Sequence, residues 1–359
     1  MTDNFSNNQR DDLDLRATVA EFIDGLPERS EDILVKRYGL QGDKKMTLEQ
    51  VGQNYNITRE RVRQIESATL RDLLASEKVK HLEPAEDLIV TVLEDYGQVM
   101  EHNALVEKAL EKTSDETHGN HIEFVLHVSG KFYDQKEDDY YKKAWYIKDA
   151  DLSIPKKVVD SFIEILEEKN EPVPHEEIHG YIKNHDVANE IAEHIDDSDR
   201  IIAFLRLGKR IQKNPYSEWG MAHWNEIMPR GVKDKAYVVL KKEARPLHFT
   251  EITEKINSNA FGSKIAVPQT VHNELIKDER FVLVGRGIYA LVAWGYKPGT
   301  VADVVADVLK ETEKPLSKED IVEEVLKQRL VKKNTIVLAL QNNDKIKREG
   351  ETYLLIEDK

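Results

Sequence analysis

TLEQVGQNYNITRERVRQIESATLRDLL, residues 47–74, is the stretch that decides the fold of the N-terminal part of the chain. Thr47, with Gln50 three residues later, has the capping-box pattern that begins a helix. That helix is short, and Tyr55-Asn56-Ile57 follows it as a turn. Thr58 can then cap a second, longer helix. Two helices joined by so tight a turn predict a helix-turn-helix.

The second helix of this motif has two chemically different faces at about 100° per residue. The arc expected to pack on Leu48 and Val51 carries Val62, Ile65, Ala68, Thr69 and Leu73. The opposite arc carries Arg59, Glu60, Arg63, Gln64 and Ser67. Arginine can bind guanine, glutamate can accept a hydrogen bond from cytosine, and glutamine can pair with adenine, so this arc suits a recognition helix. A solvated charged face with no ligand is the alternative.

Two further helices are expected before this motif. The segment DLRATVAEFIDGL places Leu15, Val19, Phe22, Ile23 and Leu26 at helical spacing. Pro27 precedes the second of these helices, with Ser30 as its expected N-cap and Gly39 at its end.

These residues resemble region four of bacterial primary sigma factors. The resemblance covers residues 13–80 and is carried by ILVKRYGL and by the highly specific run TRERVRQIE. It implies recognition of a −35 promoter element and docking on the flap of the RNA polymerase β subunit. By matching position it implies base reading by Arg59, Glu60 and Gln64. It also implies contacts to backbone phosphates by Thr47, Leu48, Glu49, Thr58, Arg61 and Arg63. Nothing in the rest of the chain resembles the other sigma segments, so a complete sigma factor is not expected.

Composition and charge bound what the rest of the chain can be. The 359 residues suggest two to four domains, the absence of cysteine excludes disulfides and thiolate sites, and the net charge is −15. Residues 28–80 carry 11 Lys/Arg against 9 Asp/Glu, whereas residues 81–359 carry 39 against 52. We therefore expect DNA contacts near the N-terminus and protein partners, not DNA, for the acidic remainder. Residues 1–12 are expected to be a disordered tail, and the absence of an apolar span predicts a soluble, cytoplasmic protein with no membrane partner.

A repeated unit fills the acidic remainder. Val99, Val173, Leu247 and Leu316 mark the same position in four similar segments, and proline precedes the last three. In each segment helices are followed by alternating residues with a turn, which predicts a small winged helix. The expected units span residues 84–150, 154–230, 231–296 and 299–356. An unrelated helical array is the alternative.

The third unit resembles a known module. PLHFTEI and VHNELIKDERFVLVGRGIYALVAWGY, within residues 231–296, resemble the HARE-type winged helix-turn-helix, which also forms the folded domain of the RNA polymerase delta subunit. The resemblance is fair for residues 299–356 and weak for the first two units. It implies an accessory role in transcription or DNA modification, without catalytic residues. Aromatic residues that close the units are expected to plug their cores: Trp145, Trp224, Trp294 and Tyr353.

One pattern points instead to an enzyme. His175-Glu176-Glu177-Ile178-His179 fits the H-E-x-x-H pattern of zinc hydrolases, with His185 available as a third ligand. The same place in the other units holds unrelated residues, so we expect no zinc. His118, His121 and His127 are expected to be surface residues of a loop and a helix. Lys209, Arg210 and Lys213 form a small basic wing without an assigned use.

The sequence thus predicts a mainly α protein with small β-hairpins, in which a helix-turn-helix precedes tandem winged-helix units. The predicted function is a DNA-binding transcription initiation or regulatory factor that acts with bacterial RNA polymerase, without enzymatic activity, cofactor or metal. Its expected partners are promoter duplex DNA and the polymerase core, through the β-flap or other subunits. The first alternative is a protein-only adaptor that competes for the flap and never reads DNA, and the remote alternative is a zinc peptidase that uses HEEIH.

Overall fold

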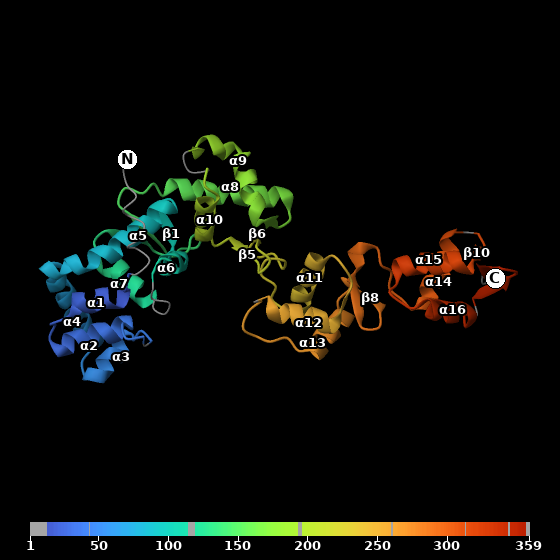
Figure 1. Cartoon of the computed structure of the whole chain (residues 1–359), viewed down its shortest axis with the longest axis horizontal. Helices are drawn as coiled ribbons and strands as arrows, with labels where there is room; N and C mark the ends of the chain where they lie inside the picture. Colours follow the sequence, from blue (N-terminus) through green and yellow to red (C-terminus); the bar gives the residue numbers. More distant parts are fainter. Residues whose placement is uncertain are drawn as a thin grey trace. The chain divides into compact units, whose positions relative to one another are not determined.

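The structure is a computed structural model that describes residues 13–42, 44–113, 119–192, 196–259, 261–312, 314–343 and 345–356. The predicted tail, residues 1–12, lies outside the described residues. The chain divides into two compact units, residues 1–212 and residues 213–359 (Figure 1). The predicted fold class is confirmed, because helices alternate with small antiparallel sheets. Within the described ranges no helix is long and apolar enough to cross a membrane.

The N-terminal helices follow the predicted pattern, with one difference at the second. They are α1 (Leu15–Ile23), α2 (Glu28–Tyr38), α3 (Leu48–Tyr55), α4 (Arg59–Leu74) and the 3-10 helix η1 (Glu77–Leu82). Gly39 ends α2 in the left-handed conformation, with φ 67°, as its position predicted. Pro27, and not Ser30, occupies the N-cap, because the fixed φ of proline lets the helix begin at the next residue.

Each of the four repeats has the same order of elements. Repeat one comprises α5 (Glu83–Asp95), β1 (Val99–Glu101), α6 (His102–Leu110), α7 (Gly119–Val128), β2 (Phe132–Gln135) and β3 (Ala144–Ile147). Repeat two comprises α8 (Ser153–Lys169), β4 (Val173–Pro174), η2 (His175–Glu177), α9 (Ile178–Lys183), η3 (Asp186–Asn189), α10 (Ser198–Leu207), β5 (Ile211–Lys213) and β6 (Glu218–Met221). Repeat three comprises α11 (Val232–Glu243), β7 (Leu247–His248), α12 (Phe249–Ser258), α13 (Pro268–Lys277), β8 (Phe281–Gly285), β9 (Ile288–Leu291) and η5 (Val292–Trp294). Repeat four comprises α14 (Val301–Thr312), β10 (Leu316–Ser317), α15 (Lys318–Gln328), α16 (Lys333–Gln341), β11 (Ile346–Glu349) and β12 (Thr352–Leu355).

The residues that mark the repeat in the sequence begin a short strand that was not predicted. Val99, Val173, Leu247 and Leu316 are the first residues of β1, β4, β7 and β10. In repeats one, three and four this strand pairs antiparallel with the last strand, which gives the sheet orders β1-β3-β2, β7-β9-β8 and β10-β12-β11. The marker residue lies opposite a tyrosine each time: Tyr146, Tyr289 and Tyr353. Each hairpin is thereby fastened to the first loop of its own repeat.

The aromatic residues expected to close the units are not equivalent. Trp145 lies inside β3 and is buried, and Tyr353 lies inside β12. Trp224 follows β6, and Trp294 lies in η5 after β9, where both are only partly buried. The alternation of a strand end and the turn after it is too irregular to set this register from sequence.

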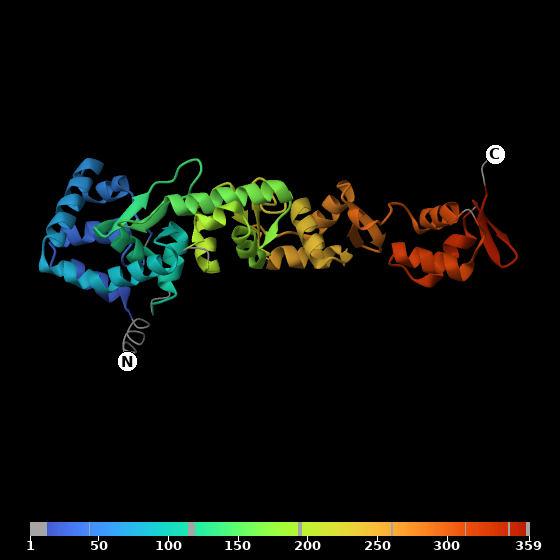
Figure 2. The same cartoon turned by 90° about the horizontal axis from the view of Figure 1, so that it is seen from above.

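The four N-terminal helices do not form a separate core. Leu15, Val19 and Phe22 of α1 belong to the same buried cluster as Ile89 of α5 and Phe124 of α7. Phe124 has no exposed surface. Its ring meets Phe22 edge-on at a centroid distance of 6.1 Å and Tyr38 at 5.0 Å. The sigma-like helices and repeat one therefore share a core inside the first unit, as the blue and cyan segments show in Figure 2.

Neighbouring repeats within each unit are joined by backbone hydrogen bonds. In the first unit the Lys142 N–H donates to the Leu207 carbonyl (2.9 Å), and the Lys209 N–H donates to the Tyr140 carbonyl (2.8 Å). In the second unit the Leu330 N–H donates to the Val284 carbonyl (2.9 Å). The wing of repeat one and strand β8 of repeat three are thus each occupied along one edge.

Candidate nucleic-acid interface

The two helix starts of the motif are capped as predicted. The Thr47 hydroxyl accepts from the Gln50 N–H (3.2 Å), and the Thr47 N–H donates to Gln50 Oε1 (2.8 Å), which completes the capping box. The Thr58 hydroxyl accepts from the Arg61 N–H (3.2 Å). Asn56 adopts the left-handed conformation in the turn, with φ 53°. Local sequence chemistry therefore accounts for where α3 and α4 begin.

The inner side of the motif is a small apolar core. Ile33, Val51 and Val62 are fully buried in it, and the half-buried side chains around it are Met46, Leu48, Tyr55, Ile57 and Ile65. Ala68 was expected on the buried arc but is exposed. Because α4 touches its neighbours along a narrow stripe, one residue at the edge of the predicted arc remains in solvent.

The predicted reading arc of α4 is exposed along its full length. Arg59, Glu60, Arg63, Gln64 and Ser67 are all exposed to solvent. Arg71 is also exposed and follows Gln64 by seven residues, which places it on the same helical face. The sequence analysis did not single out Arg71, although this spacing was available to identify it. Basic side chains thus extend along the face from its N-terminal end toward its C-terminal end.

Two of the proposed base readers are already paired within α4. Arg63 donates to both carboxylate oxygens of Glu60, at 3.0 and 2.7 Å. This hydrogen bond lowers the pKa of Glu60 and raises the pKa of Arg63, so both groups are charged at neutral pH. Arg61 donates to Gln64 Oε1 at 3.3 Å. Each pair joins a predicted base contact to a predicted phosphate contact.

Arg59 differs from these paired residues. Within the part of the chain that the structure describes, no carboxylate lies within ion-pair distance of its guanidinium. It is also the first residue of α4, at the end of the helix where a recognition helix meets base edges. Arg59 is therefore the reader that can bind a base without first breaking an internal contact.

The residues predicted to contact phosphates are differently equipped. Thr47 and Thr58 are exposed, but their hydroxyls accept the cap hydrogen bonds. Leu48 is half-buried in the small core, so only its backbone N–H can face an anion. The exposed carboxylate of Glu49 would repel a phosphate. Of the predicted phosphate contacts, Arg61 and Arg63 carry the positive charge.

The loop between α2 and α3 is anchored on repeat one. Asn120 Nδ2 donates to the Gly39 carbonyl (3.0 Å), and the His121 ring nitrogen Nε2 lies 3.1 Å from the Leu40 carbonyl. Lys45 Nζ lies 2.5 Å from the Glu123 carboxylate. His121, which was expected on the surface, is buried by this contact. His118 lies outside the described residues, and His127 is partly buried beside Trp145.

Glu123 is the charged centre of this anchor. Its carboxylate lies 2.5 Å from Lys45 Nζ and 3.4 Å from His102 Nε2, and the Trp145 indole N–H donates to His102 Nδ1 at 2.9 Å. Burial raises the pKa of Glu123, but the hydrogen bonds from His102 and Lys45 outweigh it and hold the pKa at about 2. The network positions the helix-turn-helix on repeat one.

Replacement of Glu123 by glutamine is expected to make the variant less stable than the wild type in a pH-dependent way. Folding depresses the pKa of Glu123 from 4.5 to about 2, so its stabilising effect is present above about pH 4.5 and is lost as the pH falls toward 2. Urea unfolding at several pH values should show a deficit that shrinks over this window. Glu111→Gln, which removes an exposed partner of Lys108, should show little deficit. A deficit for Glu123→Gln that is constant over the window would contradict this assignment.

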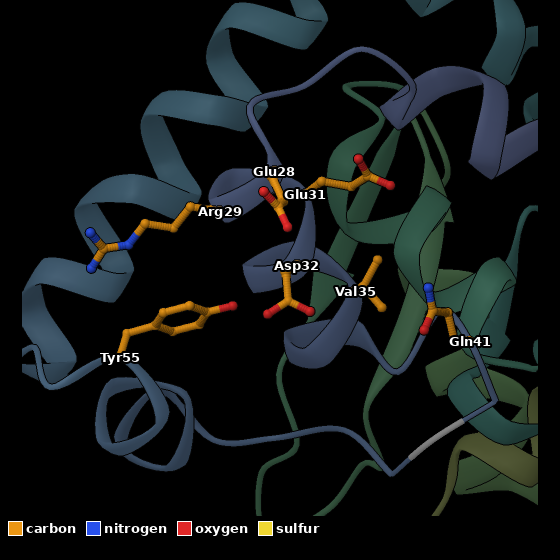
Figure 3. A pocket seen from close by; sticks show the side chains of 7 residues that line it. All are labelled: Glu28, Arg29, Glu31, Asp32, Val35, Gln41 and Tyr55. Carbon is orange, nitrogen blue, oxygen red and sulfur yellow. The ribbon is translucent and has the colours of Figure 1, made fainter.

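A pocket of about 520 Å³ lies beside the motif, between α2 and the end of α3 (Figure 3). Figure 3 shows Arg29 and Tyr55 at one end and Gln41 at the other. Its remaining lining residues are Glu28, Glu31, Asp32 and Val35. Three carboxylates among seven lining residues make the pocket unsuited to a phosphate backbone. The face for DNA is therefore the arc of α4.

The residues that pointed to other chemistry do not assemble a site in the structure. His175 lies in the 3-10 helix η2 and His179 in α9, while His185 lies 3.4 Å from Glu164. Among the residues described, no group of three or more His, Asp or Glu side chains is placed to hold a metal ion.

The small basic wing of repeat two is largely neutralised. Lys209 lies 2.6 Å from the Glu137 carboxylate, and Arg210 lies 3.0 Å from Glu167. Since both cations are held by acidic partners in the same unit, this wing offers little net positive charge to a phosphate.

Two segments of the chain match known families. Residues 22–73 match the family described as Sigma-70, region 4, and residues 230–294 match the HARE-HTH family, a helix-turn-helix domain named after ASXL and restriction endonuclease proteins, which confirms both resemblances. Among curated proteins, the chain is 48% identical over 59 residues to the RNA polymerase sigma factor SigA of Nostoc sp., which covers 16% of this chain and 15% of that protein. It is 48% identical over 59 residues to the RNA polymerase sigma factor SigA of Microcystis aeruginosa, which covers 16% and 14%. It is 41% identical over 68 residues to the RNA polymerase sigma factor SigA of Bacillus sp., which covers 19% and 18%. The chain thus spans less than a fifth of the length of these sigma factors.

Proposed function

We propose that this chain is a DNA-binding transcription factor that acts with bacterial RNA polymerase and reads a −35-like promoter element through α3 and α4. The observation that carries the proposal is the exposed arc of α4, on which Arg59, Glu60 and Gln64 lie together at the N-terminal end. The similarity of residues 22–73 to sigma-70 region 4 supports both the DNA ligand and the polymerase partner.

The burial pattern favours DNA reading over a protein-only adaptor. An adaptor needs an accessible apolar face for its partner, because protein interfaces are built around buried apolar anchors. The apolar sides of α1 and α2 are covered by α5 and α7 of repeat one. The polar arc of α4 is exposed instead, and its side chains suit base edges and phosphates.

Each predicted residue has a distinct role in this proposal. Arg59 binds a base directly, whereas Glu60 and Gln64 exchange their partners Arg63 and Arg61 for bases when the two arginines move to phosphates. The backbone N–H groups at the start of α3 and α4 add phosphate contacts. The role is non-catalytic, as expected of sigma region 4 and HARE-type modules, and the acidic repeats serve as a platform for the polymerase or another regulator.

Arg59→Ala is expected to weaken binding to a −35-like duplex by about 1–3 kcal/mol and to relax the preference at one base pair. Arg63→Ala should weaken binding to all sequences and lower the salt dependence, because it removes a phosphate contact. Fluorescence anisotropy with the full chain and labelled duplexes measures both effects. The full chain is required because a fragment of residues 13–80 would expose the shared core.

The outcome that would replace this proposal is equal affinity of the full chain for the −35-like duplex and a scrambled duplex at low salt. If the chain then still bound RNA polymerase in a pull-down, the adaptor function would account for the sigma-like segment. Polymerase binding without DNA preference and DNA preference without polymerase binding are thus told apart.

A further inference from the structure

Repeat four is divided into an acidic and a basic half. Residues 299–328, which contain α14 and α15, carry four lysines against eight Asp/Glu. Residues 329–349, which contain α16 and β11, carry six Lys/Arg against two Asp/Glu. The net charge of residues 81–359 conceals this division, because it averages the basic half with a large acidic excess.

Five of the six basic side chains in the second half are exposed. Lys332 and Lys333 lie at the start of α16, and Lys345, Lys347 and Arg348 lie at or in β11. The sixth, Arg329, is buried and donates to the carbonyls of Leu283, Lys297 and Gly299 of repeat three and the linker. Its guanidinium is held inside the unit, so the surface patch consists of the other five.

These five side chains are poorly neutralised. Within the described residues no carboxylate lies within ion-pair distance of Lys332 or Lys333. Lys347 lies 3.0 Å from Glu349 on the same strand, and the Arg348 guanidinium lies over the Tyr353 ring at 5.9 Å. In contrast, Lys209 and Arg210 of repeat two are held by acidic residues of other elements.

The helix between these cations suits a groove of DNA. Ile336 and Leu340 of α16 are buried in one core with Tyr353 of the hairpin, so the helix and the wing form one body. The exposed side of α16 carries amide, hydroxyl and apolar groups without a carboxylate: Asn334, Thr335, Leu338 and Gln341. The third helix of each other repeat contains an acidic residue: Glu123, Asp199 and Glu274. Only α16 among these four helices therefore lacks a group that repels phosphate.

We propose that the winged helix of repeat four is a second DNA-contact module. Lys332, Lys333, Lys345, Lys347 and Arg348 bind backbone phosphates of duplex DNA, and α16 faces the major groove between them. The side chains of α16 that face the groove are uncharged, so the contact is largely independent of sequence. This replaces, for repeat four, the expectation that residues 81–359 ignore DNA. The module adds affinity and salt dependence to whatever preference the helix-turn-helix has.

The test compares two triple variants of the full chain. Lys332→Ala, Lys333→Ala and Lys347→Ala remove three charges from the basic half. Lys310→Ala, Lys318→Ala and Lys327→Ala remove three exposed charges from α14 and α15 and serve as the matched control. All six lysines are exposed, so both variants are expected to fold, which circular dichroism checks.

Binding of a labelled duplex of scrambled sequence is measured at several salt concentrations. The basic-half variant should bind at least about tenfold more weakly near 0.05 M salt, and its plot of log K against log salt should be shallower by about 2–3. The control variant should match the wild type in both. Equal affinity of the basic-half variant and the wild type, or an equal loss in both variants, would overturn the proposal.

Two further outcomes separate this proposal from that for the helix-turn-helix. If Arg59→Ala has no effect on sequence preference while the basic-half variant loses affinity, repeat four binds DNA and the reading arc does not. If the basic-half variant keeps its DNA affinity but loses RNA polymerase in a pull-down, the patch binds protein and the DNA assignment is overturned.

Discussion

Phe124→Ala is expected to destabilise the first unit by about 3–5 kcal/mol, the usual cost of a buried phenylalanine replaced by alanine. Phe124 belongs to α7 of repeat one, but its ring contacts Phe22 of α1 and Tyr38 of α2. The cavity would therefore weaken the sigma-like helices and repeat one together. The expected result is a lower free energy of unfolding and loss of protection in both segments at once.

Amide hydrogen exchange on the full chain measures this coupling. In Phe124→Ala, peptides from residues 15–38 and from residues 83–128 should lose protection in parallel. Phe281→Ala removes a buried phenylalanine from the core of repeat three and is the matched control, which should leave both segments protected. Loss of protection confined to residues 83–128 would show that the two modules are independent and would contradict the shared core.

Gly52→Ala is expected to abolish DNA binding through the helix-turn-helix. A Cβ at position 52 would lie 2.6 Å from the Ile57 carbonyl oxygen, a backbone atom that cannot move aside as a side chain does. The Ile57 N–H also donates to the Gly52 carbonyl (3.0 Å), so the turn is held tightly against α3. Overpacking costs about 1–3 kcal/mol, and a backbone clash belongs at the upper end.

The effect should be local because the motif has its own small core. Ile33, Val51 and Val62 cannot absorb a shift of the turn without separating α3 from α4. Anisotropy with a −35-like duplex should show no preference for Gly52→Ala, while exchange in repeat three is unchanged. Gly130→Ala, with no heavy atom within 4 Å of the new Cβ, is the control and should bind as the wild type does. Wild-type binding by Gly52→Ala would contradict the described turn.

Local chemistry made most of the elements predictable. The caps at Thr47 and Thr58, the end of α2 at Gly39 and the exposed arc of α4 depend on residues a few positions apart, and the sequence shows them directly. Ser30 was misplaced as a cap because proline competes for the same position. The first strand of each repeat was missed because two or three residues are too few to show alternation.

Contacts between distant residues were not predictable in the same way. The contact of Phe124 with Phe22 and the pairing of Lys45 with Glu123 join segments far apart in sequence, and neither leaves a periodic pattern. The exposure of Arg59, Glu60 and Gln64 could be predicted from helical spacing, but the pairing of Glu60 with Arg63 depends on side-chain rotamers. The charge of repeat four was hidden because the regional sum took no account of which face each residue occupies.

Selection from a pool of randomised duplexes by the full chain tests the central claim most directly, because it assumes no target sequence. The claim is that Arg59, Glu60 and Gln64 read base pairs. The account predicts that the wild type enriches one motif, and that Arg59→Ala enriches the same motif with the preference lost at one base pair. Enrichment of no motif by the wild type, or of an identical motif by both proteins, would contradict base reading by α4.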